Sequence, residues 1–347
     1  MLTSITNFFN VLHIWFRPTL VALFNPRLSW AIRWRTLLLQ PTCLITYSLE
    51  TIPYLFSRPF QVEHLPVWKD RSVRCLVFKT PSPTTGDKLR PLHIEIHGGA
   101  FIGGFPEGMA HFDDKVSRET GAVVVSITYR FAPEKTFPTA IDDVDDTIRW
   151  IKKHAADRWG ADATLLTMSG VSAGGNLCLA STQQPDCHGA SQTAVKAFVG
   201  FDSVVDLRLN PNDKPTPEGF PTTNPLAILV PLFDAYAAPA RVKHIDDPRL
   251  SPILAKRETL PPRMLLTIAG MDILVAEQME LAERVNAEDV KNGQEPRVET
   301  MLVPGMMHGY IEIPDMLIPA GVKAKTMDAA IQFLNETHRI HGWTWDA

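Results

Sequence analysis

The chain has 347 residues, of which 45% are hydrophobic and 21% charged, and its formal net charge is −4. This composition is typical of a globular protein, and the length suffices for one large domain with a core of its own. The small negative charge and the lack of a basic cluster in the sequence exclude nucleic acid as an expected partner.

Residues 1–55 differ from the rest of the chain. An apolar run over 7–16 is interrupted by Arg17 and Pro18, which leaves it well short of the ~20 residues that a membrane-spanning helix needs. The segment also lacks the cationic start, long apolar run and small-residue cleavage site of a secretory signal peptide.

From residue 73 onward, apolar runs typical of strands alternate with helical stretches. Strands are expected at 73–78, 92–96, 123–128, 165–168, 195–201, 264–268 and 298–303. Helices are expected at 109–119, 141–154 and 274–292, with Gly293 ending the last one. This alternation predicts an α/β fold whose mostly parallel sheet has helices on both faces, and ligands then bind at the carboxyl ends of the strands.

Residues 206–248 break the alternation, because they are rich in proline and contain one apolar island at 226–233. We expect them to form an insertion over the ligand site. The predicted organisation is therefore an N-terminal segment, 1–55, and an α/β domain, 56–347, that carries this insertion.

Ser172 stands in the sequence GVSAGG at 170–175, between an expected strand and the start of a helix. Gly-x-Ser-x-Gly in that setting is typical of a nucleophile elbow. Small residues two before and two after the serine are required, because a Cβ there would clash with the neighbouring strand or helix. The pattern alone is weak, since many surface turns contain it.

A second glycine-rich turn, HGGAF at 97–101, follows the expected strand 92–96. In lipases and esterases such a loop supplies half of an oxyanion hole, and the N–H after the nucleophile supplies the other half. The expected donors are Gly98, Gly99 and Ala173, with Ala100 as an alternative. Taken alone, the loop could equally be an ordinary glycine turn.

These two motifs resemble those of the hormone-sensitive-lipase-like carboxylesterases. The resemblance extends to YRFAPE at 129–134, DPRLSP at 247–252, GMDIL at 270–274 and HGY at 308–310. The similarity extends over about residues 60 to 340, in the family's order. It implies an α/β-hydrolase fold with a helical cap and a serine esterase activity.

The sequence departs from the family pattern at Val171, Ala100 and Ala276. The family usually has an acidic residue, a glycine and a second acidic residue at these positions. None of the departures removes a catalytic group, so they bear on the tuning of the site and on the substrate.

The resemblance implies a triad in the order serine, acid, histidine. Ser172 is the expected nucleophile, and His308, on a loop after an expected strand, is the expected base. His338 and His341 are expected to be solvated in a charged C-terminal tail, and His154 to complement the dipole of a helix end.

Several aspartates compete for the role of the acid. Asp272 follows the expected strand 264–268, and a carboxylate there can orient the imidazole; the resemblance favours it. Asp202 and Asp206 follow the preceding strand, where some α/β-hydrolases place their acid. Asp143 is expected to anchor its helix structurally.

His93, Glu95 and His97 alternate along an expected strand, so they share one face of it. Two imidazoles and a carboxylate could hold zinc. We expect no metal, because His97 begins the oxyanion loop and a serine hydrolase needs none.

Three interpretations of residues 1–55 stay open. The resemblance supports a helical cap over the active site, in which Phe8, Phe9, Trp15 and Phe16 would pack on the insertion and wall an apolar acyl pocket. The alternatives are an amphipathic segment on a membrane surface and a pairing surface in a homodimer.

The expected function is hydrolysis of carboxylic esters of a small or medium, largely apolar substrate through an acyl-enzyme, without a cofactor. Acyl transfer or lactone formation by the same triad is the alternative, and a non-catalytic small-molecule receptor is a third that the complete triad disfavours. The four cysteines show no paired spacing, which favours a reducing, cytoplasmic location, with peripheral membrane attachment left open.

Overall fold

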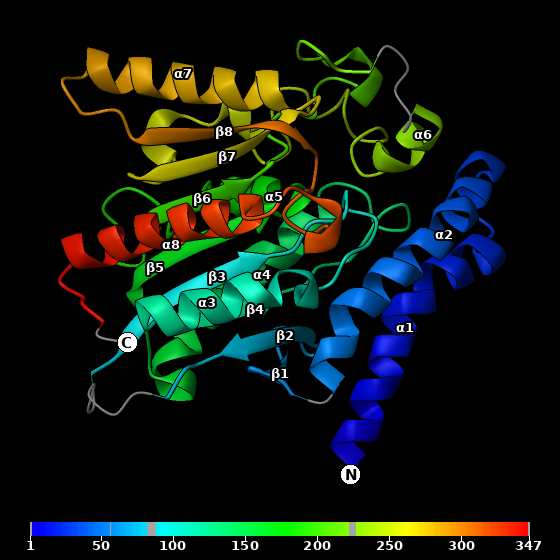
Figure 1. The fold of residues 1–347 in the computed structure, drawn as a ribbon, viewed down its shortest axis with the longest axis horizontal. Coiled ribbons are helices and arrows are strands. Elements are labelled where there is room, and N and C mark those ends of the chain that lie inside the picture. Colours follow the sequence, from blue (N-terminus) through cyan, green and yellow to red (C-terminus); the bar gives the residue numbers. More distant parts are fainter. Residues whose placement is uncertain (1, 56, 82–87, 222–226, 346–347) are drawn as a thin grey trace.

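The computed structural model describes residues 2–55, 57–81, 88–221 and 227–345, without the side chains of 2–11 and 55. An eight-stranded sheet with the order β1-β2-β4-β3-β5-β6-β7-β8 forms its centre. β1, β2 and β4 pair antiparallel, and all other neighbours are parallel. The predicted mostly parallel sheet is therefore confirmed, and Figure 1 shows helices on both of its faces.

The strands agree with the apolar runs except at one edge. They are β1 (Phe60–Leu65), β2 (Val73–Phe78), β3 (Arg90–Ile96), β4 (Val123–Ile127), β5 (Ala161–Val171), β6 (Ala197–Phe201), β7 (Met264–Met271) and β8 (Val298–Met307). β1 was not predicted, because only its first and last residues are buried and polar residues lie between them. An edge strand pairs through its backbone and needs little apolar sequence.

Eight α-helices surround the sheet in the described residues. They are α1 (Leu2–Phe24), α2 (Trp30–Thr51), α3 (Ala110–Thr120), α4 (Thr139–Trp159), α5 (Ala173–Ser181), α6 (Val230–Phe233), α7 (Val275–Lys291) and α8 (Val322–Ile340). Buried side chains of α4, α5 and α7 pack on one face of the sheet, and those of α3 and α8 on the other. α7 is followed by Gly293 at φ 70°, as predicted for a helix terminator.

His338 corrects one prediction. It does not lie in a solvated tail, because α8 extends to Ile340 and packs on α3 and the sheet. The residue one turn earlier, Leu334, is fully buried, and His338 on the same face is 1% exposed. Burial lowers the pKa of His338 to about 4, so the ring is neutral near pH 7.

The N-terminal helices lie side by side along one flank of the molecule, with α1 outermost (Figure 1). Gln40 on α2 donates to the carbonyl oxygen of Trp15 on α1 at 2.6 Å. Arg33 donates to the carbonyl oxygen of Ala22 at 2.9 Å and so satisfies the end of α1. Within the described part of the chain, no helix is both long and apolar enough to cross a membrane.

The described residues of the stretch 206–248 form turns and short helices, of which α6 lies against α2. Lys214 ties it to the sheet domain. Its buried ammonium donates to the carbonyl oxygen of Asp206 at 2.7 Å and forms an ion pair with Glu277 on α7. The other carboxylate oxygen of Glu277 accepts the N–H groups of Val205 and Asp206.

Candidate active site

Ser172 lies at the turn between β5 and α5. Its φ of 51° places it in the left-handed region, which is strained for a serine. A Cβ on Gly174 would lie 1.8 Å from the carbonyl oxygen of Ile96, and one on Gly170 would lie 2.5 Å from the carbonyl carbon of Gly174. The predicted steric requirement for both glycines is confirmed, and the close packing of β3, β5 and α5 raises the serine above the sheet edge.

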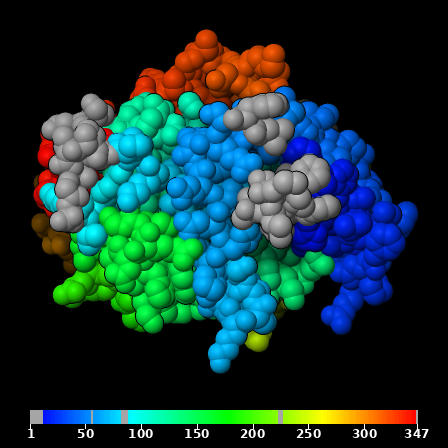
Figure 2. All heavy atoms as spheres, turned by 90° about the horizontal axis from the view of Figure 1, so that it is seen from below, coloured from blue at the N-terminus to red at the C-terminus, as the bar shows by residue number. Residues whose placement is uncertain are grey.

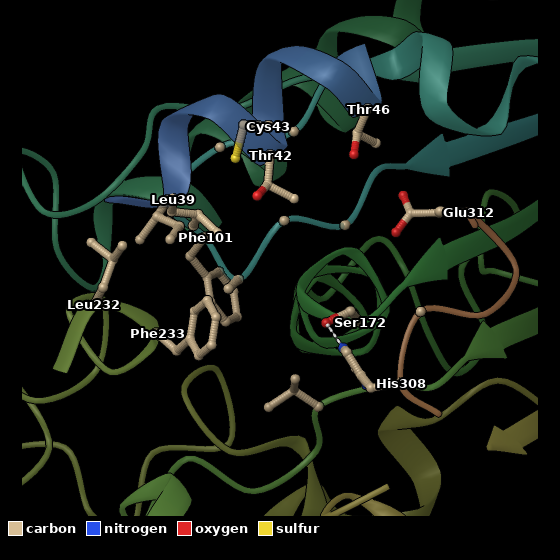
Figure 3. A pocket seen from close by; sticks show the side chains of 18 of the residues that line it. Leu39, Thr42, Cys43, Thr46, Phe101, Ser172, Leu232, Phe233, His308 and Glu312 are labelled. Carbon is tan, nitrogen blue, oxygen red and sulfur yellow. Dashed lines mark hydrogen bonds between the residues drawn. The ribbon is translucent and has the colours of Figure 1, made fainter. Parts of the chain in front are cut away.

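Ser172, His308 and Asp272 form a continuous hydrogen-bonded chain. Nε2 of His308 lies 2.9 Å from Oγ of Ser172, as Figure 3 shows, and Nδ1 lies 2.7 Å from Oδ2 of Asp272. The three residues follow β5, β8 and β7, whose carboxyl ends meet at one edge of the sheet. Such an arrangement can move a proton from the hydroxyl to the imidazole.

Asp202, the rival acid, has a different position. Its two carboxylate oxygens accept the N–H of Ala269 on β7 at 2.7 Å and the N–H of Gly309 at 3.0 Å. It therefore holds the loop that carries His308 against β7. Asp206 pairs with Arg208 at 2.7 Å, so only Asp272 among these aspartates reaches the imidazole in the described structure.

Asp143 has the structural role that its position predicted. Its carboxylate is 1% exposed. It binds the Arg130 guanidinium at 2.7 Å and that of Arg71 at 2.5 Å. These contacts fasten α4 to the two loops that carry Arg71 and Arg130.

Electrostatics around His308 favour its charged form. Burial acts to lower its pKa, but the facing Asp272 carboxylate, with Asp202 and Glu312, raises the pKa to about 9. Glu312 follows His308 by four residues and lines the same cavity. Burial raises the pKa of the Glu312 carboxyl to about 7, so it is ionised where His308 titrates.

His97 fastens the glycine-rich loop rather than facing Ser172. Its Nδ1 lies 2.7 Å from the carbonyl oxygen of Gly98, and its Nε2 lies 2.9 Å from Oγ of Thr128. The ring stacks on Tyr129, whose hydroxyl donates to the carbonyl oxygen of His97. These bonds hold the carbonyl groups of His97 and Gly98. Gly98 and Gly99 themselves lie on the cavity wall.

The alternating His93, Glu95 and His97 do not converge on a metal position. Both ring nitrogens of His93 are engaged at 2.9 Å by Thr167 and Ser169, and those of His97 are engaged as above. Glu95 accepts from Ser126 instead. Among the described residues, no group of three or more histidine, cysteine or acidic side chains could hold a metal ion.

A cavity of about 670 Å³ opens beside Ser172 and His308. Helix α2 contributes lining residues that the sequence did not predict, including Leu39, Thr42 and Cys43, which Figure 3 shows above the serine. Leu232 and Phe233 of α6 lie near Phe101, on the same side of Ser172 as Leu39 (Figure 3). The cavity therefore lies between the sheet domain, the N-terminal helices and the stretch 206–248.

The predicted aromatic wall is different from the one observed. Phe16 is 43% exposed, and neither it nor Trp15 lines the cavity; α1 contributes Arg17, Pro18 and Val21 instead. Phe8 and Phe9 lie where side chains are not described. The reason is helical phase, since residues 17, 18 and 21 point inward while 16 and 20 point outward.

The chain is similar to known proteins over most of its length. The alpha/beta hydrolase fold family matches residues 93–312. Carboxylesterase NlhH of Mycobacterium tuberculosis is 30% identical over 251 residues, which are 70% of this chain and 72% of that protein. Arylacetamide deacetylase of Mus musculus is 36% identical over 154 residues, which are 40% of this chain and 37% of the deacetylase. This second match therefore spans little more than a third of the relative.

Solved structures agree with the fold. The thermostable carboxylesterase EstE1 from a metagenomic library is 26% identical, with a TM-score of 0.66, over 84% of this chain and 95% of that one. The esterase of Pyrobaculum calidifontis is 24% identical, with a TM-score of 0.67, over 93% and 97% of the two chains.

Fold and site together define an α/β-hydrolase. The family match covers more than half of the chain, and the NlhH match covers most of both proteins. The chain therefore belongs to the hormone-sensitive-lipase-like carboxylesterases, a family of carboxylic ester hydrolases.

The elbow glycines make a prediction about stability. We expect Gly174→Ala to destabilise the protein by more than about 3 kcal/mol, because the new Cβ meets the rigid backbone of β3. Gly293→Ala is the matched control: it has a positive φ but open space around it, so it should cost only about 1 kcal/mol. Urea unfolding measures both, and equal losses would contradict the steric explanation.

The carboxylates around His308 predict a pH dependence. The imidazole acts as a base only when neutral, so kcat/KM should rise as pH rises through the His308 pKa of about 9. Glu312→Gln removes a negative charge that favours imidazolium, which lowers this pKa and moves the rising limb to lower pH. Asp315→Asn, an exposed carboxylate on the same loop, should leave the limb in place. If the rising limb of the kcat/KM profile stays at the same pH in Glu312→Gln, the proposed effect of the Glu312 charge on the His308 pKa is wrong.

Proposed function

We propose that this protein hydrolyses apolar carboxylic esters through an acyl-enzyme formed on Ser172. The observation that carries the proposal is the chain of hydrogen bonds from Ser172 through His308 to Asp272, at the wall of a largely apolar cavity. Membership of a carboxylesterase family supports the reaction type.

In the proposed first half-reaction, Oγ of Ser172 attacks the ester carbonyl carbon while Nε2 of His308 takes the hydroxyl proton. The new Oγ–C bond moves the carbonyl electron pair onto oxygen. His308 then gives the proton to the leaving alcohol, and the C–O bond breaks. Asp272 accepts the Nδ1–H throughout, so it keeps the required tautomer and stabilises the imidazolium.

Backbone amides are the proposed partners of the oxyanion. Ala173 is the first residue of α5, where the N–H has no intrahelical acceptor and the helix dipole favours negative charge. Gly98 and Gly99 face the same cavity from the loop that His97 fastens. In the second half-reaction these donors hold the oxyanion again while His308 activates water. Losing one such donor typically costs about 3 kcal/mol of transition-state stabilisation.

The cavity's chemistry indicates the substrate class. Leu39, Phe101, Leu232 and Phe233 gather on one side of Ser172 (Figure 3). These side chains offer no charge, so the acyl or alcohol part that they receive is apolar. The volume of about 670 Å³ is in the range of sites for small or medium ligands.

The nucleophile is tested by Ser172→Ala. We expect kcat/KM for p-nitrophenyl butanoate to fall on the order of 10⁴-fold or more, because the acyl-enzyme cannot form. Ser181→Ala, at the far end of the same helix, should retain activity. A fluorophosphonate probe should label the unmodified protein on Ser172, as read by mass spectrometry.

Circular dichroism must show that the Ser172→Ala protein is folded. If it keeps most of its activity, the mechanism is wrong. Counting free acid against a transfer product, with an added alcohol, separates hydrolysis from acyl transfer.

The apolar side of the cavity is tested with p-nitrophenyl esters from acetyl to dodecanoyl. Phe233→Ala removes a ring from the wall and should shift the preference toward longer acyl chains, since each buried CH₂ adds about 0.8 kcal/mol. Ile228→Ala lies on the same stretch but outside the cavity, so its profile should match the parent. An unchanged Phe233→Ala profile would place the acyl chain elsewhere.

A further inference from the structure

Helix α2 turns a polar face inward and an apolar face outward. Its buried residues are Thr36, Gln40, Tyr47 and Thr51. Leu38, Ile45 and Leu49 on the opposite face, and Ile52 directly after the helix end, are apolar and 49–63% exposed. Surface helices of globular proteins turn the apolar face to the core, so this helix is built for an apolar surrounding outside.

Two of the inward polar side chains bond to other elements, whereas Oγ1 of Thr51 and Oε1 of Gln40 have no partner among the described residues. Gln40 donates to the Trp15 carbonyl oxygen, and the Tyr47 hydroxyl accepts the N–H of Gly104 at 3.3 Å. These bonds fix the rotation of α2 about its axis. The exposed apolar face is therefore a consequence of how the helix docks.

Helix α1 continues the same kind of surface. Its outward residues Phe16, Leu20, Leu23 and Phe24 are 43–74% exposed, while Pro18 and Val21 line the cavity. Trp30, at the start of α2, is 75% exposed. We call these five residues, together with Leu38, Ile45, Leu49 and Ile52, the N-terminal apolar face. Figure 2 shows, in dark blue, the N-terminal helices at the rim of the molecule.

The charged side chains of the two helices are arginines, apart from Glu50, which lines the cavity. Residues 1–49 contain four arginines and no aspartate or glutamate. Arg17 pairs with Glu134. Within the described residues, Arg27, Arg33 and Arg35 have no carboxylate partner, and the bonds of Arg33 and Arg35 go to backbone carbonyl oxygens. They lie around the turn between α1 and α2.

We propose that the N-terminal apolar face docks on the surface of a lipid bilayer containing anionic lipids. The stripe from Leu38 to Ile52 runs along ~21 Å of helix at 1.5 Å per residue. It would enter the boundary between headgroups and acyl chains, as interfacial helices do. Trp30 would sit at headgroup depth, where tryptophan is enriched, and the unpaired arginines would meet anionic headgroups.

A second copy of the chain fits this face less well. A two-fold dimer buries the same patch of both subunits. It would bring six unpaired arginines together with no carboxylate from residues 1–49 to neutralise them. Anionic headgroups supply the missing charge, so the charge pattern favours the bilayer.

The cavity reaches the surface at this face. Thr42 lines the cavity and is exposed, and it lies on the stripe between Leu38 and Ile45. Figure 3 shows Thr42 beside Cys43 on the cavity side of α2. An ester dissolved in the bilayer could then enter without crossing water, a consequence that rests on the proposed esterase function.

The test is vesicle flotation with the full chain carrying Ser172→Ala, so that binding is separate from catalysis. We expect flotation with phosphatidylcholine vesicles and stronger flotation when phosphatidylserine is added. Ile45→Glu/Leu49→Glu should reduce the bound fraction at least about tenfold. Arg27→Ala should reduce the phosphatidylserine-dependent part about fivefold. Val290→Glu/Ile340→Glu, which changes exposed apolar residues of α7 and α8, is the matched control and should bind normally.

Three results would overturn the proposal: no flotation with either vesicle, an equal loss in the control variant, or a dimer by light scattering that Ile45→Glu/Leu49→Glu dissociates while vesicles stay unbound. The same substitutions in protein with Ser172 intact should leave hydrolysis of soluble p-nitrophenyl butanoate within about twofold, since they lie outside the cavity. Absence of that hydrolysis in the parent protein would contradict the proposed function and leave the flotation result standing.

Discussion

The close contact between β3, β5 and α5 is the constraint on which the rest of the site depends. Gly174 packs its backbone against the carbonyl of Ile96 with no room for a Cβ. Because α5 can approach so closely, its first N–H and the Ser172 hydroxyl both lie at the carboxyl edge of the sheet. The strain at Ser172, with φ of 51°, is held by the packed core on either side.

Three carboxylates around His308 have separate tasks, although all of them favour its charged form. Asp272 contacts the imidazole, Asp202 contacts the backbone of the loop, and Glu312 faces the cavity. Only the first can select a tautomer. The second sets where the ring is, because Gly309 directly follows His308. The role of a carboxylate in such a site therefore depends on the groups that donate hydrogen bonds to it. Its separation from His308 along the chain says little about that role.

The sequence allowed the sheet and the place of Ser172 at a strand-to-helix turn to be predicted because both rest on local signals, whereas the choice of Asp272 and His308 rested on the family resemblance. Buried parallel strands are continuous apolar runs, and the elbow needs glycines at fixed offsets. β1 and His338 were missed for the opposite reason. Edge pairing and one residue's burial depend on contacts with distant elements, which leave little trace in local composition. The partners of Asp202, Glu277 and His97 likewise come from segments far away in the chain.

The N-terminal helices show the limit of periodicity most clearly. The residues at 38, 45, 49 and 52 share a helical face, and this pattern ordinarily marks the side turned to the core. Here the core side is chosen by polar contacts instead, since Gln40 and Tyr47 find backbone partners there. A polar group buried with its partner costs little, whereas a buried orphan costs about 1–3 kcal/mol. The exposed apolar face costs free energy only while water covers it, so the docking of α2 is consistent with an environment that water does not fill.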